Sequence, residues 1–221
     1  MELLIINQGE SKNQKTIYDD VDAKLTSEGM QQACNTGLWL KKSILTQGFH
    51  GYVSPGVAPL QTGSVISEIT GINFTVNSKL RNFDFTGTTE INLPASRSLL
   101  FENINWPPKL CSGVNFTPDN IDTFLKRINA FHESIKDDKK VVVVASPAVC
   151  IALAQIASGI DLEEIIPMCE KTKETLAKYP DGVPTEHAGD VLYLTGMLWC
   201  GITMISGGVA NWFSKTVVTN E

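Results

Sequence analysis

Polar side chains that could take part in chemistry follow two apolar runs of strand length. The run at residues 2–6 leads into Asn7 and Gln8, and the valine-rich run at residues 140–145 leads into Ser146. The nitrogen lone pair of an amide is delocalised into its carbonyl, so Gln8 is not a nucleophile. Ser146 stands where a nucleophilic serine could be presented, but its flanks VASPA lack the Gly-x-Ser-x-Gly pattern of such sites. A turn serine that caps the following helix is the favoured interpretation.

No other pattern in the chain predicts a metal or cofactor site. The three histidines, at positions 50, 132 and 187, fall outside the expected strand ends. An acidic cluster at residues 19–22 lacks the glycine and the distal glutamate of a calcium loop. Neither a Gly-x-Gly-x-x-Gly motif nor a Gly-Lys-Ser/Thr phosphate loop occurs. The five cysteines are scattered without a Cys-x-x-Cys pair, which indicates reduced thiols. We therefore expect no cofactor and no metal.

Composition and charge narrow the classes of partner. The 221 residues are 43% hydrophobic, and the formal net charge is −6, so no basic surplus is present for nucleic acid or an anionic membrane surface. The charge-free stretches at residues 141–160 and 191–214 are broken by proline or glycine into pieces of strand and helix length, which argues against a membrane span. The N-terminus has no basic region before an apolar one. We expect a soluble protein of the reducing cytoplasm.

Strand and helix patterns alternate along the chain. Strands are expected at residues 2–6, 51–54, 73–76 and 140–145, with helices at 26–42, 55–69, 120–135 and 148–158. Further strands are expected at 191–195 and 200–206. This alternation predicts an α/β fold with a mostly parallel sheet covered on both faces, and ligands bind such sheets at the carboxyl ends of the strands. We expect one domain over residues 1–221, with an irregular insertion at 86–118 that either caps the sheet or forms a short helical excursion.

Five segments carry a family resemblance through their order. They read IINQGES, LTSEGMQQACNTGLWLK, YVSPGVAPLQTGSVISEITG, KLRNFDF and VVVVASPAVCIALAQIASG. This order resembles the histidine phosphatase superfamily, which has the phosphoglycerate-mutase-like fold. The positions that match the family's motifs are Gly9, Glu10, Ser11, Leu25, Thr26, Gly29, Gln32, Ala33, Ser54, Pro55, Gln61, Thr62, Leu80 and Arg81. The resemblance covers residues 2–85 and 140–160, and it implies a three-layer α/β/α sandwich.

The same resemblance locates the counterparts of the family's five catalytic side chains. The nucleophilic histidine corresponds to Gln8, and the arginine before it corresponds to Asn7. The second phosphate-binding arginine falls on Ala58, the acidic proton donor on Asn82 and the second histidine on Ser146. Other residues that could line this vestigial pocket are Glu10, Ser54 and Asp84.

Replacement of all five side chains removes the parts that phosphoryl transfer through a histidine needs. Electrostatic stabilisation of the transferring group is usually the largest catalytic contribution, and the replacements carry no positive charge. The sequence therefore suggests a catalytically inactive pseudoenzyme, not an enzyme, for which phosphate or phosphoester binding is not expected. It would act through a protein partner, self-association, regulation or structural assembly. The alternative is a re-purposed enzyme or small-molecule sensor that uses the old cleft for a neutral or cationic ligand.

Overall fold

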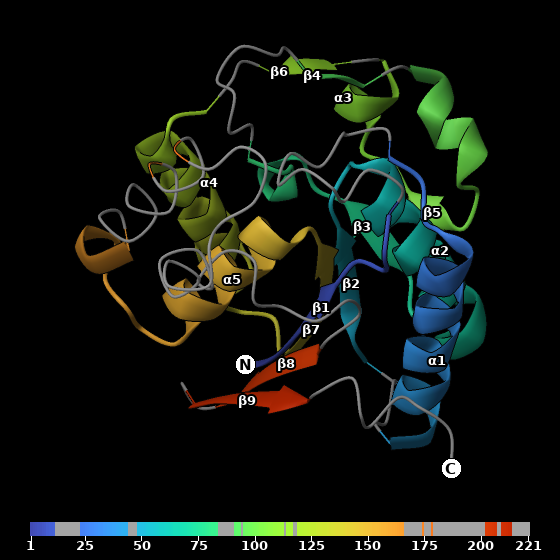
Figure 1. Cartoon of the computed structure of the whole chain (residues 1–221), viewed down its shortest axis with the longest axis horizontal. Helices are drawn as coiled ribbons and strands as arrows, with labels where there is room; N and C mark the ends of the chain where they lie inside the picture. The colour runs from blue at the N-terminus through green and yellow to red at the C-terminus, as the bar shows by residue number, and fades with distance from the viewer. Residues whose placement is uncertain are drawn as a thin grey trace.

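A seven-stranded sheet forms the centre of the protein in the computed structural model, with helices on both faces (Figure 1). The structure describes residues 1–11, 23–43, 48–83, 91–93, 95–112, 114–116, 119–165, 174, 178, 202–206 and 209–213. In spatial order the strands are β5 (Ile104–Asn105), β3 (Phe74–Val76), β2 (His50–Val53), β7 (Lys140–Ala145), β1 (Glu2–Asn7), β8 (Ile202–Ser206) and β9 (Val209–Phe213).

The direction of the strands follows from how they are connected. The five strands from β5 to β1 run parallel, while β8 pairs antiparallel with β1 and β9 pairs antiparallel with β8. Parallel neighbours need a crossover, which the helices provide. These helices are α1 (Ser27–Ser43), α2 (Val57–Thr70) and α4 (Ile121–Ser134), with the short turn η1 (Ser78–Leu80) after β3. A further helix, α5 (Pro147–Ala157), follows β7. The prediction of a three-layer α/β/α fold with a mostly parallel sheet is confirmed.

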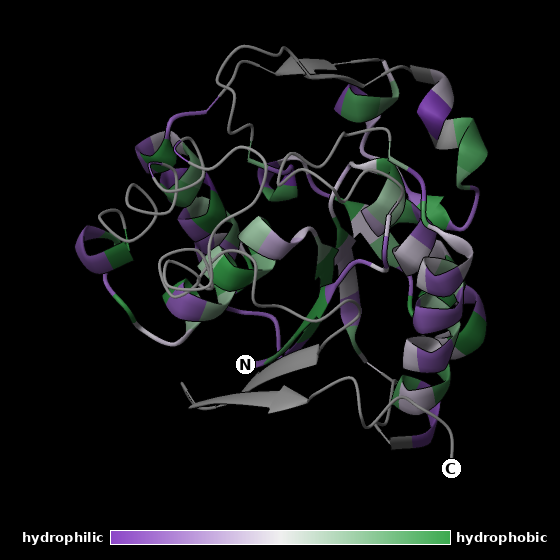
Figure 2. Ribbon diagram, viewed as in Figure 1, coloured by the Kyte–Doolittle hydropathy of each residue, from purple (hydrophilic) through white to green (hydrophobic). Residues whose placement is uncertain are grey.

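The hydrophobic core has two halves because successive side chains of a strand point to opposite faces. Leu3 and Ile5 of β1 pack in the half covered by α4 and α5. Leu4 and Ile6 pack in the other half, with apolar side chains of α1 and α2. Figure 2 shows the hydrophobic colouring along β1 and β7, between helices in which hydrophilic and hydrophobic residues are mixed. Both faces of β1 and β7 are packed, one against each half of the core. Their ends are therefore firmly positioned, which is what a site at those ends requires.

The insertion at residues 86–118 contains more regular structure than the sequence indicated. The described part holds β4 (Ile91–Leu93) paired with β6 (Val114–Phe116), the turn helix η2 (Ala95–Leu100) and α3 (Pro108–Cys111). Its strand β5 pairs with β3 at the edge of the central sheet. Elements of two to six residues show no measurable periodicity, which is why the sequence pattern missed them. The division of residues 1–221 into one domain stays a prediction.

The C-terminal part adds a hairpin to the sheet. Strand β8 lies within the expected strand at residues 200–206, whereas β9 was not expected. The strand expected at residues 191–195 lies outside the described residues. None of the described helices is both long and apolar enough to cross a membrane.

Candidate functional site

Four polar side chains lie side by side at the carboxyl end of the central strands. Gln8 donates its backbone N–H to the carbonyl of Ala145 at 2.9 Å, and Ser54 donates its backbone N–H to the carbonyl of Val144 at 2.9 Å. These bonds place the ends of β1, β7 and β2 together and bring the buried side chains of Asn7, Gln8, Ser54 and Ser146 to one edge of the sheet. We call these four residues, together with Asn82, the strand-end set.

Ser146 contacts Asn82 directly. Its hydroxyl donates to the Asn82 Oδ1 at 2.6 Å, although the two residues are far apart in the sequence. Ser146 is the N-terminal cap residue of α5, but its side chain makes no capping hydrogen bond. The expected role of Ser146 as a helix-capping side chain is therefore wrong, because its hydroxyl is hydrogen-bonded to Asn82 instead. The Oγ atom of Ser54 is also buried, and no described residue forms a hydrogen bond with it.

The start of α2 reaches the same edge through the glycine turn after β1. Gly9 donates its N–H to the Oγ1 of Thr62 at 3.0 Å, and that hydroxyl donates to the carbonyl of Ala58 at 2.9 Å. Ala58 itself is buried in the first turn of α2. Of the five positions singled out by the family resemblance, Asn7, Gln8 and Ser146 lie at the ends of β1 and β7, Asn82 is bonded to Ser146, and Ala58 lies in the first turn of α2. That all five form one functional site stays a prediction.

Glu10 serves the junction between β1 and α1. Its carboxylate accepts a hydrogen bond from the Thr26 hydroxyl at 2.9 Å, and its N–H donates to the Gln32 Oε1 at 3.0 Å. The Thr26 hydroxyl in turn accepts the N–H of Gly29 and so caps α1. A Cβ on Gly29 would lie 2.1 Å from the carbonyl oxygen of Glu10, so only glycine allows this approach. Asp84, the other expected acidic lining residue, lies outside the described residues.

A buried charge cluster fixes the loop that carries Asn82. Arg81 Nη2 lies 2.7 Å from the Asp119 Oδ1, and Arg127 bonds the other oxygen of the same carboxylate. Arg127 Nη1 also donates to the carbonyls of Lys79 and Arg81, at 2.6 and 3.0 Å. Burial lowers the pKa of Arg127 to about 10, although the hydrogen bond that Arg127 donates to Asp119 raises it, and the charge of Arg81 lowers it further. Burial likewise lowers the pKa of Arg81, and Asp119 opposes that shift. The cluster thus holds the backbone next to Asn82 in place.

Arg97 is a residue near the site that the sequence reasoning missed. It comes from η2 of the insertion, its side chain is only 4% exposed, and its Nη1 donates to the carbonyl of Pro55 at 3.2 Å. Pro55 directly follows Ser54, so a guanidinium lies beside the end of β2. The expectation that the site lacks any positive charge was incomplete. The available signal was that Arg97 is the one charged residue in the stretch from 91 to 101.

Metal ligands are not gathered in the described part of the chain. Among those residues no group of three or more histidine, cysteine, aspartate or glutamate side chains could hold a metal ion. His50 lies at the amino end of β2, His132 lies in α4, and His187 lies outside the described residues.

A crossover α/β sheet with polar groups at the carboxyl ends of its strands defines a class of ligand-binding α/β proteins. Within that class, the chain belongs to the histidine phosphatase superfamily, because the model for branch 1 of this family matches residues 4–186. A search of curated protein sequences returned no match.

Solved structures of phosphatases share the fold. The ecdysone phosphate phosphatase of Bombix mori, in complex with tungstate, is 14% identical with a TM-score of 0.58, over 96% of this chain and 92% of its own. A mycobacterial glucosyl-3-phosphoglycerate phosphatase, in complex with VO3, is 16% identical with a TM-score of 0.57, over 96% of both chains. A putative alpha-ribazole-5'-P phosphatase of Escherichia coli is 12% identical with a TM-score of 0.54, over 96% and 94%. At these identities the likeness shows the fold alone.

The comparisons contradict the prediction that this chain is not an enzyme. The family whose model matches is a family of phosphatases, and the solved structures of this fold named above are phosphatases. The doubt about phosphoester binding has no support from them either. The error lay in one inference: the amide of Gln8 excludes a phosphohistidine at that position, but it does not exclude every reaction.

Proposed function

We propose that this chain is a re-purposed enzyme of the histidine phosphatase superfamily whose strand-end set binds an uncharged polar molecule. The observation that carries the proposal is the buried Ser54 hydroxyl, which has no hydrogen-bond partner among the described residues. Ser54 lies at the same end of the sheet as the hydrogen-bonded pair Ser146 and Asn82. A buried polar group without a partner costs about 1–3 kcal/mol. A ligand that bonds Ser54 removes this cost, so the site favours an occupant.

The chemistry of the strand-end set suits an uncharged ligand. Hydroxyl and amide side chains both donate and accept hydrogen bonds, so Ser54, Ser146 and Gln8 can match an alcohol, an amide or a sugar. Gln8 and Asn7 cannot replace the histidine and arginine on which phosphoryl transfer through a phosphohistidine depends. The guanidinium of Arg97 beside Pro55 disfavours a cationic ligand. The alternative is that the strand-end set binds an anion. Membership of a phosphatase family favours this alternative, and the positive charge of Arg97 would attract an anion.

A binding experiment separates these ligand classes. Ligand-observed NMR with a panel of small alcohols, amides and sugars should reveal binders whose affinity falls about tenfold or more in Ser54→Ala, because one hydrogen bond to a buried group is lost. The exposed residue Gln31 provides the control, since Gln31→Ala should not change binding. Inorganic phosphate should not compete. Displacement of the bound compound by phosphate, or equal binding by Ser54→Ala, would refute the proposal.

A turnover assay tests the enzymatic part. Phosphomonoesters and esters of uncharged alcohols are offered to the wild type, to Ser146→Ala and to Gln8→Ala. Turnover of the uncharged esters that Ser146→Ala abolishes supports the proposal. Turnover of phosphomonoesters that depends on Gln8 contradicts it.

A second candidate function, binding of a protein partner or of another copy, has its own observation. Leu99 and Leu100 of the insertion are 76% and 73% exposed, and leucines this exposed are unusual when they are adjacent. If they form an interface, Leu99→Ser with Leu100→Ser should dissociate an oligomer seen by light scattering. Leu38→Ser, at a single exposed leucine of α1, is the matched control.

A further inference from the structure

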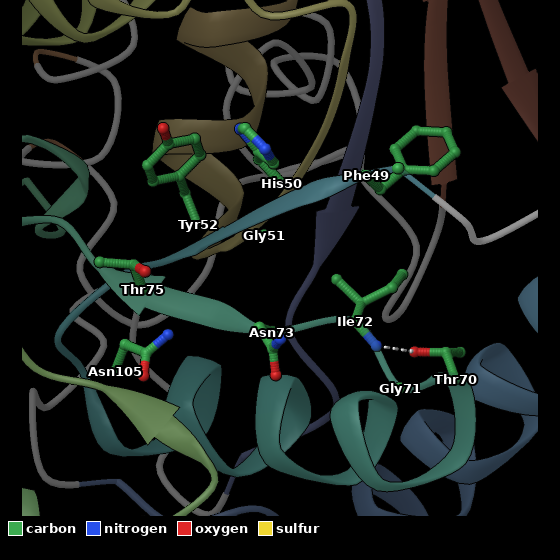
Figure 3. Close-up of a pocket in the computed structure, with 11 residues that line it drawn as sticks. Phe49, His50, Gly51, Tyr52, Thr70, Gly71, Ile72, Asn73, Thr75 and Asn105 are labelled. Atoms are coloured by element: carbon green, nitrogen blue, oxygen red, sulfur yellow. Dashed lines mark hydrogen bonds between the residues drawn. The ribbon is translucent and has the colours of Figure 1, made fainter.

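A hollow in the described part of the protein lies at the other end of the central sheet from the strand-end set. It has a volume of about 460 Å³ and is lined by residues of β2, β3 and β5 and of the turns that precede β2 and β3 (Figure 3). Phe49 and His50 stand at the start of β2, and Ile72 and Asn73 stand just before β3. Strand-end residues such as Gln8 lie after their strands, so the two sites are separate. The volume falls in the range of small-molecule sites, about 300–1,000 Å³.

The lining of this hollow, which we call the amino-end pocket, contains no side chain of aspartate, glutamate, lysine or arginine among its eleven residues. Its polar side chains are amides, hydroxyls and an imidazole: Asn73, Thr75, Asn105, Thr70, Tyr52 and His50. A charged group of each sign lies beside the lining: the Asp138 carboxylate, in contact with Tyr52 and His50, and the Lys140 ammonium, 5.2 Å from the centroid of the Phe49 ring. Neither an anion nor a cation is therefore favoured by a net charge. Groups that both donate and accept suit a ligand rich in hydroxyls.

Asp138 contacts two of the ring side chains that line the pocket, Tyr52 and His50. The Tyr52 hydroxyl donates to the Asp138 Oδ2 at 3.4 Å, and His50 Nδ1 lies 3.5 Å from the Oδ1 of the same carboxylate. Tyr52 also packs edge-on against Phe131 of α4, with ring centroids 5.4 Å apart. These contacts fix an aromatic wall without using the amides of Asn73 and Asn105, which are on exposed residues.

The backbone leaves room for a ligand at the turn after α2. Gly71 has a φ of 75°, and a Cβ placed on it would meet nothing within 4 Å. The N–H of the next residue, Ile72, is already taken by the Thr70 hydroxyl at 3.2 Å (Figure 3). A ligand would therefore bond the side chains of Asn73, Thr75 and Asn105 and lie with its apolar parts against the ring of Tyr52, since Phe49 and Ile72 are buried in the core.

We propose that the amino-end pocket is a binding site for a neutral, polyhydroxylated molecule of monosaccharide size. The proposal does not depend on the function proposed for the strand-end set, since no residue is shared.

The test is an NMR titration of the uniformly ¹⁵N-labelled full chain with D-glucose and with D-ribose. The backbone amides of Gly51, Ile72 and Thr75 should shift saturably with at least one sugar, while those of Gly9 and Ala148 at the strand ends should not. The double variant Asn73→Ala with Asn105→Ala should lose at least about tenfold in affinity for the sugar, because two hydrogen bonds are lost. Asn35→Ala, on α1 away from the pocket, should bind as the wild type does.

Each other outcome overturns the proposal. Absence of saturable shifts with both sugars would do so, as would shifts confined to Gly9 and Ala148. An equal affinity of the double variant would show that the amides do not hold the sugar, provided that its spectrum shows a folded protein. Thr75→Val, which removes only a hydroxyl, serves if the double variant does not fold. Saturable shifts of the pocket amides with inorganic phosphate would show that the pocket takes an anion instead.

Discussion

Gly29 should tolerate no side chain, because the backbone after β1 touches the first turn of α1 there. A Cβ on Gly29 would lie 2.1 Å from the carbonyl oxygen and 2.8 Å from the nitrogen of Glu10, and both are backbone atoms that must move. Overpacking costs about 1–3 kcal/mol, and a clash with backbone belongs at the upper end. Alanine in a helix recovers about 0.5–1 kcal/mol relative to glycine. We therefore expect Gly29→Ala to lower the free energy of unfolding by about 2 kcal/mol.

Gly37 of the same helix is the matched control. The three nearest atoms to a Cβ there all belong to the side chain of Ile69: its Cδ1 at 2.9 Å, its Cβ at 3.2 Å and its Cγ2 at 3.4 Å. Overpacking against a side chain belongs at the lower end of about 1–3 kcal/mol, and the helix preference of alanine offsets it, so Gly37→Ala should change the free energy of unfolding by less than about 1 kcal/mol. Urea unfolding followed by circular dichroism measures both variants, with the midpoint read at constant slope. Equal stabilities of the two variants would refute the close approach of Gly29 to Glu10.

Three further predictions concern other parts of the structure. Asp119→Ala should destabilise the protein by about 3–5 kcal/mol in urea unfolding, because it removes the carboxylate that bonds the buried guanidinium of Arg127 and also that of Arg81; a loss below about 1 kcal/mol, as for an exposed pair, would contradict this. Burial and then the charge of Lys136 lower the pKa of His132, so the unfolded chain binds more protons as the pH falls through 6.5. The free energy of unfolding should then decrease from pH 7.5 to 5.5, and by less in His132→Gln; an unchanged decrease would contradict the assignment. Arg97→Met should make the insertion more sensitive to limited proteolysis, whereas Lys109→Met, at an exposed residue of α3, should not; equal digestion patterns would show that the Pro55 contact does not tie the insertion down.

The fold was predictable from the sequence because its signals are long and agree with each other. The strands at residues 2–7 and 140–145 contain continuous apolar runs at residues 3–6 and 141–145, as buried parallel strands do, and the helices that follow them begin at polar cap residues. Asn120 illustrates this, since its side chain accepts the N–H of Thr123 at the start of α4. The short strands of the insertion and β9 were not predictable, because pairing in space rather than local pattern defines them.

Motif order named Gln8, Asn82 and Ser146 as candidate site residues, and that they form one functional site stays a prediction. Their contacts could not be read from the sequence: only the structure shows that Ser146 bonds Asn82 and that the Glu10 carboxylate accepts the hydroxyl of Thr26. Arg97 escaped notice because its place beside Pro55 depends on how the insertion folds back. The amino-end pocket is assembled from residues of three strands, which no linear pattern brings together.

The most direct test of the central claim is a calorimetric titration with tungstate, the anion bound in the Bombix mori phosphatase structure. It compares the wild type with a variant that restores all five family side chains: Asn7→Arg, Gln8→His, Ala58→Arg, Asn82→Glu and Ser146→His. If these positions form one site that now serves an uncharged ligand, the wild type should show no saturable heat and the restored variant should bind tungstate. Saturable binding of tungstate by the wild type, weakened by Ser54→Ala, would contradict the account.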